Sequence, residues 1–148
     1  MKAVLQRVLN AKLNVDGEKI SQIDKGLVVF LGVEKGDTDE LCQKICKKIA
    51  NIRIFEDENG KMNLSLKDIN GQILLVSQFT LLADCSHGNR PNFLNAEIPT
   101  IAKPLYEKAI ENLKIEGVDV KTGIFGADMK IDQVNDGPVT IILDNSIF

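Results

Sequence analysis

The apolar run LVVFLGV at residues 27–33 constrains the fold of this chain more than any other stretch. A strand with one solvated face alternates apolar and polar residues, whereas a strand covered on both faces is apolar throughout. The run therefore predicts a central strand that is buried on both faces. It is far shorter than the roughly 20 apolar residues of a membrane-spanning helix. Because the N-terminal segment also lacks a signal-peptide core, we expect a soluble, cytoplasmic protein with no membrane contact.

Length and composition limit the classes of protein that the chain can belong to. Its 148 residues, 44% of them apolar, fit one globular domain over 1–148. The net charge of −3 provides no overall basic field, so any RNA contact has to be local. Cys42 and Cys46 stand four apart in an apolar helical pattern, which predicts reduced thiols in a core. His87 is the only histidine, so the ligands of a zinc site are missing, and we expect no metal and no cofactor.

Turn residues predict two hairpins in the first half of the chain. Asp16-Gly17 suits a tight hairpin turn, because both central residues of such a turn need positive φ. Asn59-Gly60 predicts a second turn of this kind. The strands on either side of the first turn span 3–15 and 18–24, and the second hairpin spans 53–64.

Two helices are predicted from helical spacing and end signals. Asp37 followed by Glu40 resembles a capping box, and apolar residues then recur every three or four positions, which predicts a helix over 38–51. A second apolar pattern ends at Gly117, a typical helix terminator. Its start is left open between two positions, Pro99 and Pro104.

The remaining segments complete an α+β fold. QILLVSQFTLL at 72–82 predicts a strand and 83–95 a loop, and 118–144 predicts two or three short strands interrupted by Gly123, Gly126 and Gly137. Strands outnumber helices, and several of them are joined by tight turns. The fold class is therefore α+β, with a mixed, largely antiparallel sheet as a barrel-like core and two main helices packed on it.

The segment SQFT at 77–80 interrupts an apolar strand with polar side chains. An unpaired polar group in a buried strand costs about 1–3 kcal/mol, so Ser77, Gln78 and Thr80 each need a partner or contact with solvent. Two interpretations stay open at this level. The segment is either a functional site or the end of a strand that emerges into solvent.

The segment NDGPVT at 135–140 consists of turn-forming residues followed by β-formers. A turn that opens the last strand explains it locally, because proline is tolerated at the first position of a strand. Glycine before proline adds conformational freedom, since proline restricts the residue that precedes it. Only about 5–6% of X-Pro bonds in folded proteins are cis, so composition alone predicts a trans bond.

Taken together, SQFTL at 77–81 and NDGPVT at 135–140 resemble the two signature motifs of D-aminoacyl-tRNA deacylases of the bacterial and eukaryotic type. Further segments agree with that family in order and spacing, so the resemblance covers nearly the whole chain. These segments are QRV at 6–8, FLGVEKGD at 30–37, RIFEDENGKMN at 53–63, GNRPNF at 88–93 and TGIFGADM at 122–129.

The resemblance implies a homodimeric hydrolase that cleaves the ester between a D-amino acid, or glycine, and the 3′ end of tRNA. It also implies roles for individual residues. The floor of the pocket is formed by the first motif, Ser77, Gln78, Phe79 and Thr80. The second motif contributes a cis peptide bond that reaches into the partner's pocket, between Gly137 and Pro138. Arg7 resembles the arginine that orients the Gly-Pro carbonyls, and Met129 resembles a pocket residue.

Two reaction mechanisms are compatible with these residues. A nucleophilic Thr80 needs a base to remove its proton, and the sequence offers no clear one. Alternatively, a bound water attacks the activated ester, N–H groups near Phe79 and Thr80 stabilise the oxyanion, and the tRNA 2′-OH assists with protons. We favour the second route, because it requires neither a histidine nor a metal.

Two other classes of protein compete with the deacylase. The first is a non-catalytic RNA-binding module that uses the lysines of the first helix, Lys44, Lys47 and Lys48. The second is a thiol enzyme built on Cys85 and His87, although neighbours in sequence seldom have the geometry of a nucleophile and its base. The RNA-binding module leaves the SQFT segment unexplained.

Overall fold

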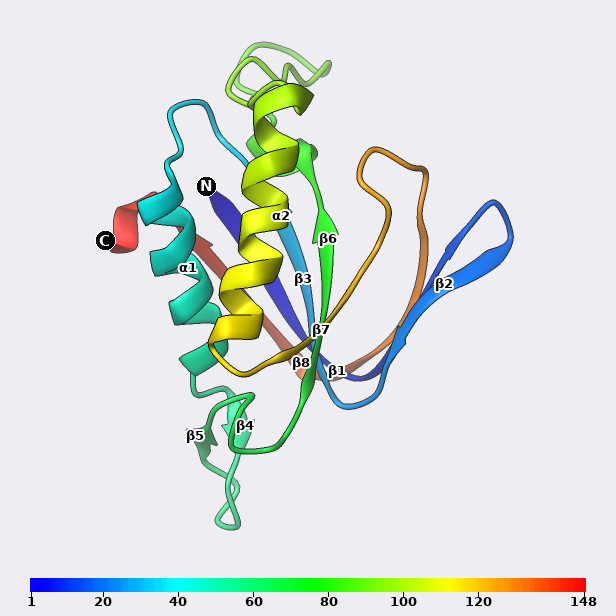
Figure 1. Ribbon diagram of the computed structural model, residues 1–148, viewed down its shortest axis with the longest axis vertical. Coiled ribbons are helices and arrows are strands. Elements are labelled where there is room, and N and C mark those ends of the chain that lie inside the picture. The colour runs from blue at the N-terminus through cyan, green and yellow to red at the C-terminus, as the bar shows by residue number, and fades with distance from the viewer.

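The computed structural model describes residues 1–148 and has an α+β architecture (Figure 1). Two long helices lie side by side on one face of a strongly curved sheet, and a small hairpin extends from one end. The helices are α1 (Asp39–Asn51) and α2 (Pro99–Ile115). The strands are β1 (Lys2–Val15), β2 (Glu18–Ile23), β3 (Gly26–Gly32), β4 (Phe55–Glu56), β5 (Met62–Leu64), β6 (Gln72–Ser77), β7 (Asp119–Thr122) and β8 (Lys130–Asp144).

The predicted central strand is confirmed as β3. It pairs antiparallel with β1 on one side and parallel with β6 on the other, and six of its seven residues are buried. The strand order is β2-β1-β3-β6-β7, and β8 pairs with the remaining edge of β1. The sheet is therefore mixed, as predicted, with parallel pairs only at β3–β6 and β6–β7.

The sheet curls until it nearly closes on itself. On one edge of β1, the first half of the strand pairs with β3 and the second half pairs with β2. The long strand β1 therefore joins the two ends of the curl. Strand β2 then returns toward the far edge, where Ser21 Oγ donates to the Thr122 carbonyl of β7 and Gln72 Oε1 of β6 accepts the Asp24 N–H at 2.9 Å. A small apolar cluster fills the interior of this barrel-like curl. Its members are Val8, Ala11, Leu13, Val15, Ile23, Val28, Leu74 and Val76.

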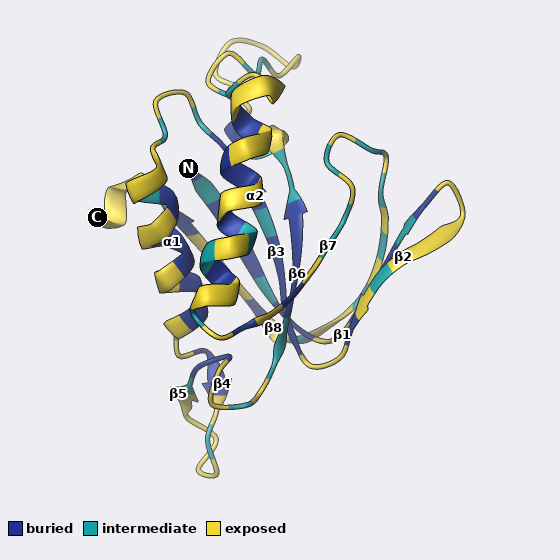
Figure 2. Ribbon diagram, in the orientation of Figure 1, coloured by how far each residue is buried: buried dark blue, intermediate teal, exposed yellow.

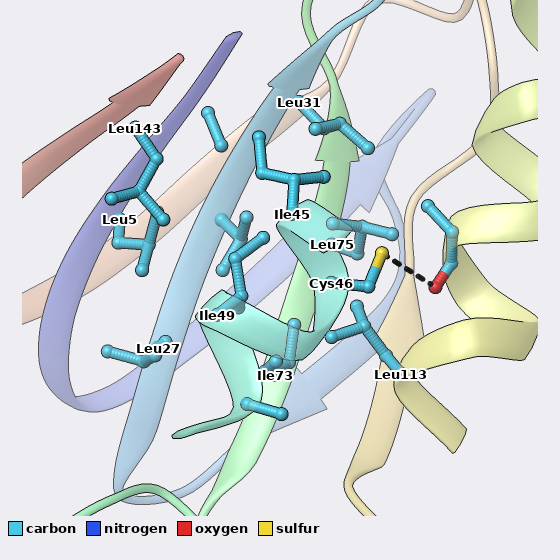
Figure 3. Packing of buried hydrophobic residues seen from close by; sticks show 14 of the residues in the cluster. Leu5, Leu27, Leu31, Ile45, Cys46, Ile49, Ile73, Leu75, Leu113 and Leu143 are labelled. Atoms are coloured by element: carbon cyan, nitrogen blue, oxygen red, sulfur yellow. Dashed lines mark hydrogen bonds between the residues drawn. The ribbon is translucent and has the colours of Figure 1, made fainter. Parts of the chain in front are cut away.

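The larger core lies between the sheet and the two helices (Figures 2 and 3). Both helices turn their apolar stripes inward, while their outer faces are exposed. Cys42 and Cys46 are reduced and buried in this layer, as predicted. Their Sγ atoms lie 3.6 Å from the α2 carbonyls of Leu105 and Ala109, so the thiols join the two helices. Neither helix has the length and apolar character that a membrane crossing requires.

Tight turns occur where the sequence predicted them. Asp16 and Gly17 both have positive φ, 50° and 82°, in the turn between β1 and β2. Gly60, at φ 72°, lies in the turn of the β4–β5 hairpin. Helix α2 begins at Pro99, which settles the choice that the sequence left open between Pro99 and Pro104.

The predicted capping box of α1 is wrong. The N-cap is Thr38, whose Oγ1 accepts the Leu41 N–H at 3.2 Å. Asp37 is instead turned back, and its Oδ2 accepts the Glu34 N–H at 2.7 Å. Glu40 pairs with Lys44 one turn along the exposed face of the helix. Threonine and aspartate are both good cap residues, so the spacing alone could not choose between adjacent candidates.

Two strand predictions are also corrected. The strand predicted over 72–82 ends at Ser77, and a 3₁₀ helix, η1 (Phe79–Leu82), follows. The segment 118–144 forms β7 and one long strand, β8, rather than short strands interrupted at Gly137. Gly137 lies inside β8, at a break in its register with β1.

The corrected cap of α1 leads to a stability prediction. Thr38→Ala removes the acceptor of the Leu41 N–H, so we expect the free energy of unfolding to fall by about 1 kcal/mol. Glu40→Gln is the matched control, because it alters the exposed Glu40–Lys44 pair at 2.7 Å but no cap, and we expect a change below about 0.5 kcal/mol. Urea denaturation followed by circular dichroism measures both values. An equal or larger loss in Glu40→Gln would show that the cap is misassigned.

Candidate functional site

A pocket of about 620 Å³ opens beside the C-terminal end of β6. Its walls come from the ends of β3 and β6, from η1, from α2 and the segment that leads into it, and from the loop between β7 and β8. Of its 19 lining residues, 13 are hydrophobic. Such a volume and lining are typical of sites that enclose a small molecule or the end of a larger one.

The pocket exists because β6 stops pairing at Ser77. The last bond to β3 runs from the Gln78 N–H to the Leu31 carbonyl at 2.9 Å, and the chain then turns into η1. It passes closely over Gly32, where an added Cβ would lie 2.8 Å from the Gln78 carbonyl oxygen. The SQFT segment is thus the end of a strand, which was one of the two predicted interpretations, and it also borders the pocket.

Three residues of the first motif line the pocket, namely Ser77, Gln78 and Phe79. The Phe79 side chain is 56% exposed and meets Phe93 edge to face, with ring centroids 5.0 Å apart. Thr80 does not line the pocket but stands next to it, where its Oγ1 accepts a hydrogen bond from Gln78 Nε2. The motif therefore presents an amide, a hydroxyl and an aromatic ring at one end of the pocket.

Backbone N–H groups add donors to this end of the pocket. The first hydrogen bond of η1 runs from the Leu81 N–H to the Gln78 carbonyl at 3.4 Å. The N–H groups of Phe79 and Thr80 precede that bond, in the position where a helical turn has no acceptor for its donors. Free N–H groups at such a turn are suited to bind an anionic or partly anionic oxygen.

The opposite wall is the loop over 123–129, and it contains Met129, as the resemblance implies. The loop folds back closely on itself, because a Cβ on Gly123 would overlap Met129 Sδ. The Ala127 N–H donates to the Ile124 carbonyl at 3.2 Å and closes the turn. Met129 is thereby held against the start of its own loop.

Tyr106 supports the pocket from α2. Its hydroxyl donates to the Leu75 carbonyl of β6 at 2.7 Å, and its ring lies 5.9 Å from that of Phe125. Burial raises the pKa of the Tyr106 phenol well above its ordinary value. The hydroxyl therefore stays protonated over the physiological range and acts as a permanent donor.

The second motif lies elsewhere, at the break in the β1–β8 ladder. Gln6 pairs with Thr140 and Val8 with Asn135, so the four residues between Asn135 and Thr140 stand opposite Arg7 alone. Gly137 has φ 126°, and the Gly137–Pro138 bond is cis, the geometry that the resemblance implies. Gly137 and Pro138 are both exposed.

Arg7 anchors this bulge from the core side. The side chain is 5% exposed, and its Nε donates to the Asp136 carbonyl at 3.1 Å and lies 3.3 Å from Asp136 Oδ2. Its NH1 group donates to the Ile54 carbonyl at 2.8 Å, and NH2 lies 3.5 Å from Glu56 Oε1. Two carboxylates therefore balance the buried guanidinium, and the arginine contacts the residue that directly precedes Gly137.

The predicted site residues thus fall into two groups in one chain. Ser77, Gln78, Phe79 and Met129 line the pocket, with Thr80 at its edge. The second group consists of Arg7, Gly137 and Pro138, and none of the three lines the pocket. Sequence reasoning missed the aromatic walls, Phe93, Tyr106 and Phe125. Two of them lie in the segments GNRPNF and TGIFGADM, whereas nothing in the helical pattern marked Tyr106.

The residues of the competing interpretations lie outside the pocket. No residue of α1 lines it, and Lys44 is paired with Glu40 at 2.7 Å, while Lys47 and Lys48 are exposed. Cys85 and His87 are exposed in the loop after η1 and do not line it either. No group of three or more His, Cys, Asp or Glu side chains is placed to hold a metal ion.

Comparison with curated proteins gives full-length matches. A protein named D-aminoacyl-tRNA deacylase from Thermotoga petrophila is 53% identical over 146 residues, which is 99% of this chain and 98% of the relative. A protein of the same name from Flavobacterium psychrophilum is 51% identical over 146 residues, covering 98% of this chain and 97% of the relative.

Solved structures agree in fold. One, described as a c-Myc DNA unwinding element binding protein, has a TM-score of 0.92 and 42% identity and covers 98% of this chain and 99% of its own. Another, described as a probable eukaryotic D-amino acid tRNA deacylase, has a TM-score of 0.80 at 18% identity, covering 96% and 97%. At that identity the second likeness supports the fold alone.

The family model described as D-Tyr-tRNA(Tyr) deacylase matches residues 4–144, which include both motifs, the pocket and the Arg7 anchor. With this match and the full-length relatives, the chain belongs to the D-Tyr-tRNA(Tyr) deacylase family of hydrolases.

Proposed function

We propose that this chain hydrolyses the ester between a D-amino acid and the 3′ end of tRNA, and releases the D-amino acid and free tRNA. Glycine wrongly attached to a tRNA is a second substrate of the same kind. The observation that carries the proposal is the pocket at the end of β6, where Ser77, Gln78 and Phe79 meet an apolar wall. The reaction takes place in the cytoplasm, where tRNA is charged.

The proposed reaction uses a bound water as the nucleophile. An aminoacyl ester is already activated, so position and dipoles can supply much of the catalysis. The N–H groups of Phe79 and Thr80 stabilise the oxyanion, and the neighbouring 2′-OH of the tRNA helps to transfer protons. Gln78 donates to Thr80 Oγ1, and this bond orients the hydroxyl without removing its proton. That arrangement favours Thr80 as a positioning residue, because a nucleophile needs a base.

Chiral selection is proposed to come from the Gly137–Pro138 segment of a second copy of the chain. Its carbonyl groups accept the α-amino group of the substrate and occupy the volume that an L side chain needs. A D side chain points outward, so side-chain identity matters little. Rejection of this steric kind acts against one enantiomer and leaves binding of the other unchanged.

Two features support a dimer with a shared site. Gly137 and Pro138 are exposed and lie outside their own chain's pocket. Farther along β8, the sheet face opposite the helices carries an apolar row across three strands, formed by Ile142, Val4 and Phe30 in register. The Ile142 side chain is 64% exposed. Val4 and Phe30 beside it are half-buried. Covering such a partly exposed apolar row removes it from water, which favours contact with a second chain.

The first test compares both enantiomers of one aminoacyl-tRNA. We expect release of the D-amino acid to be at least about 100-fold faster than release of the L-amino acid at equal enzyme concentration. Release of labelled amino acid from D- and L-tyrosyl-tRNA measures both rates, with glycyl-tRNA as a third substrate. Equal rates for the two enantiomers would refute the proposed selection. Binding of tRNA without any release would refute the hydrolase and support a binding module instead.

The second test concerns Thr80. If Thr80 only positions groups, Thr80→Ala lowers kcat by about 10- to 100-fold but leaves catalysis well above background. Thr80→Ser is the matched control, because it keeps the hydroxyl that accepts from Gln78, and its kcat stays close to that of the unmodified chain. Single-turnover deacylation measures the rates. Loss to background in Thr80→Ala, or a trapped acyl-enzyme, would instead identify Thr80 as the nucleophile.

The third test mixes two inactive variants. One carries Gln78→Ala together with Phe79→Ala, and the other carries Gly137→Val. Random mixing makes half of the dimers mixed, and each mixed dimer has one intact shared site, so activity returns to about a quarter of the unmodified level. A chain with all three substitutions is the control and regains nothing. If mixed dimers form, as native mass spectrometry can verify, and remain inactive, the site is not shared.

A further inference from the structure

The pocket has three walls that come from distant parts of the sequence, and one carbonyl group joins them. Ser77 and Gln78 stand at the end of β6, Tyr106 lies in α2, and Phe125 belongs to the loop over 123–129. The Leu75 carbonyl of β6 accepts a hydrogen bond from each of the other two walls. The donors are the Tyr106 hydroxyl of α2 and the N–H group of Gly123.

The two bonds to the Leu75 carbonyl differ in length. The bond from the Gly123 N–H to the Leu75 carbonyl is 3.4 Å long. It follows the last residue pair of the β6–β7 ladder, which is Leu75 with Thr122. The Tyr106 hydroxyl lies at 2.7 Å, a normal length for a strong O–H donor. The shorter bond comes from a side chain that is 4% exposed. The weak end of the ladder is therefore supported by α2 rather than by the sheet.

Tyr106 also contacts the loop over 123–129 directly. Its ring packs against Phe125 with centroids 5.9 Å apart and planes inclined by 53°. The loop that carries Phe125 is also held by the Gly123 N–H bond, by the turn closed by Ala127 and Ile124, and by packing of Ala127 and Met129 on the smaller apolar cluster. Tyr106 thus links the loop of the Met129 wall to the strand that ends in the SQFT segment, in addition to the Gly123 N–H bond.

We propose that Tyr106 is a specificity-determining positioning residue, whose hydroxyl sets the separation between the SQFT segment and the loop over 123–129. It touches neither the ester nor the attacking water. It acts through Leu75 and Phe125 on the residues that hold the aminoacyl group. This inference rests on the proposed deacylase function, since that function defines which molecule the pocket holds.

The test uses Tyr106→Phe in the full chain. This variant keeps the ring and its contact with Phe125 but removes the donor to the Leu75 carbonyl. Because a small misplacement of a binding wall weakens substrate positioning, we expect KM for D-tyrosyl-tRNA to rise about 5- to 10-fold and the ratio of D to L release to fall about 10-fold. Hydrogen exchange followed by NMR should show faster exchange at the Gly123 N–H.

A matched control separates positioning from loss of stability. Cys46→Ala, like Tyr106→Phe, removes one buried hydrogen-bond donor, in this case the donor to the Ala109 carbonyl of α2. Cys46 lies between the two helices (Figure 3) and does not line the pocket. Partial unfolding lowers the amount of active enzyme without altering KM or the ratio of D to L release. We therefore expect Cys46→Ala to lower the melting temperature and to leave both quantities unchanged.

A second substitution keeps the inference testable if Tyr106→Phe does not fold. Phe125→Leu, at a half-buried position, removes the ring contact from the loop side, and we expect the same direction of change in KM and in the D to L ratio. If the unmodified chain cleaves D-tyrosyl-tRNA and both variants keep its KM and its D to L ratio, the inference about Tyr106 is overturned while the proposed function stands. If the unmodified chain cleaves no aminoacyl-tRNA, the proposed function itself fails.

Discussion

The last bond of the β3–β6 ladder, from the Gln78 N–H to the Leu31 carbonyl at 2.9 Å, is the contact on which the site depends. Upstream of it, β6 is a buried strand whose side chains serve the two cores. Downstream, the chain turns into a short 3₁₀ helix and leaves donors without acceptors. The close approach at Gly32 permits this turn. The turn after Gln78 therefore ends the pairing of β6, opens the pocket and exposes the N–H groups of Phe79 and Thr80.

Much of the fold could be predicted because it follows from local patterns. The run at 27–33 marked the central strand, and the Asp16-Gly17 turn and the inward stripes of both helices followed from residue type and spacing. The errors have two causes. The cap at Thr38 was a choice between adjacent residues that are both good cap formers. The end of β6 at Ser77 and the continuity of β8 through Gly137 depend on partners distant in sequence. Local propensity does not contain that information.

The residues of the site also divide into those that could be predicted from the sequence and those that could not. The residues of the two motifs could be named from their resemblance to a family, and the structure places three of them, Ser77, Gln78 and Phe79, in the lining of one pocket. The aromatic wall that supports them could not be named, because Tyr106 lies in a helical pattern that any core residue would satisfy. Only the register of α2 against β6 brings its hydroxyl to the Leu75 carbonyl. The role of such a supporting residue can be recognised only when the structure shows which distant residue it contacts.

The NDGPVT segment shows how far a local explanation reaches. Turn residues in front of a strand predicted a turn, yet the strand continues on both sides of Gly137-Pro138. Because proline has no N–H to donate, the ladder cannot run through Pro138 unbroken, and the register with β1 skips there. Arg7 occupies the gap and bonds the Asp136 carbonyl in place of a backbone donor. An interrupted ladder held by a buried arginine thus projects the two exposed residues from the strand, so the segment is a bulge built into the sheet rather than a connection between strands.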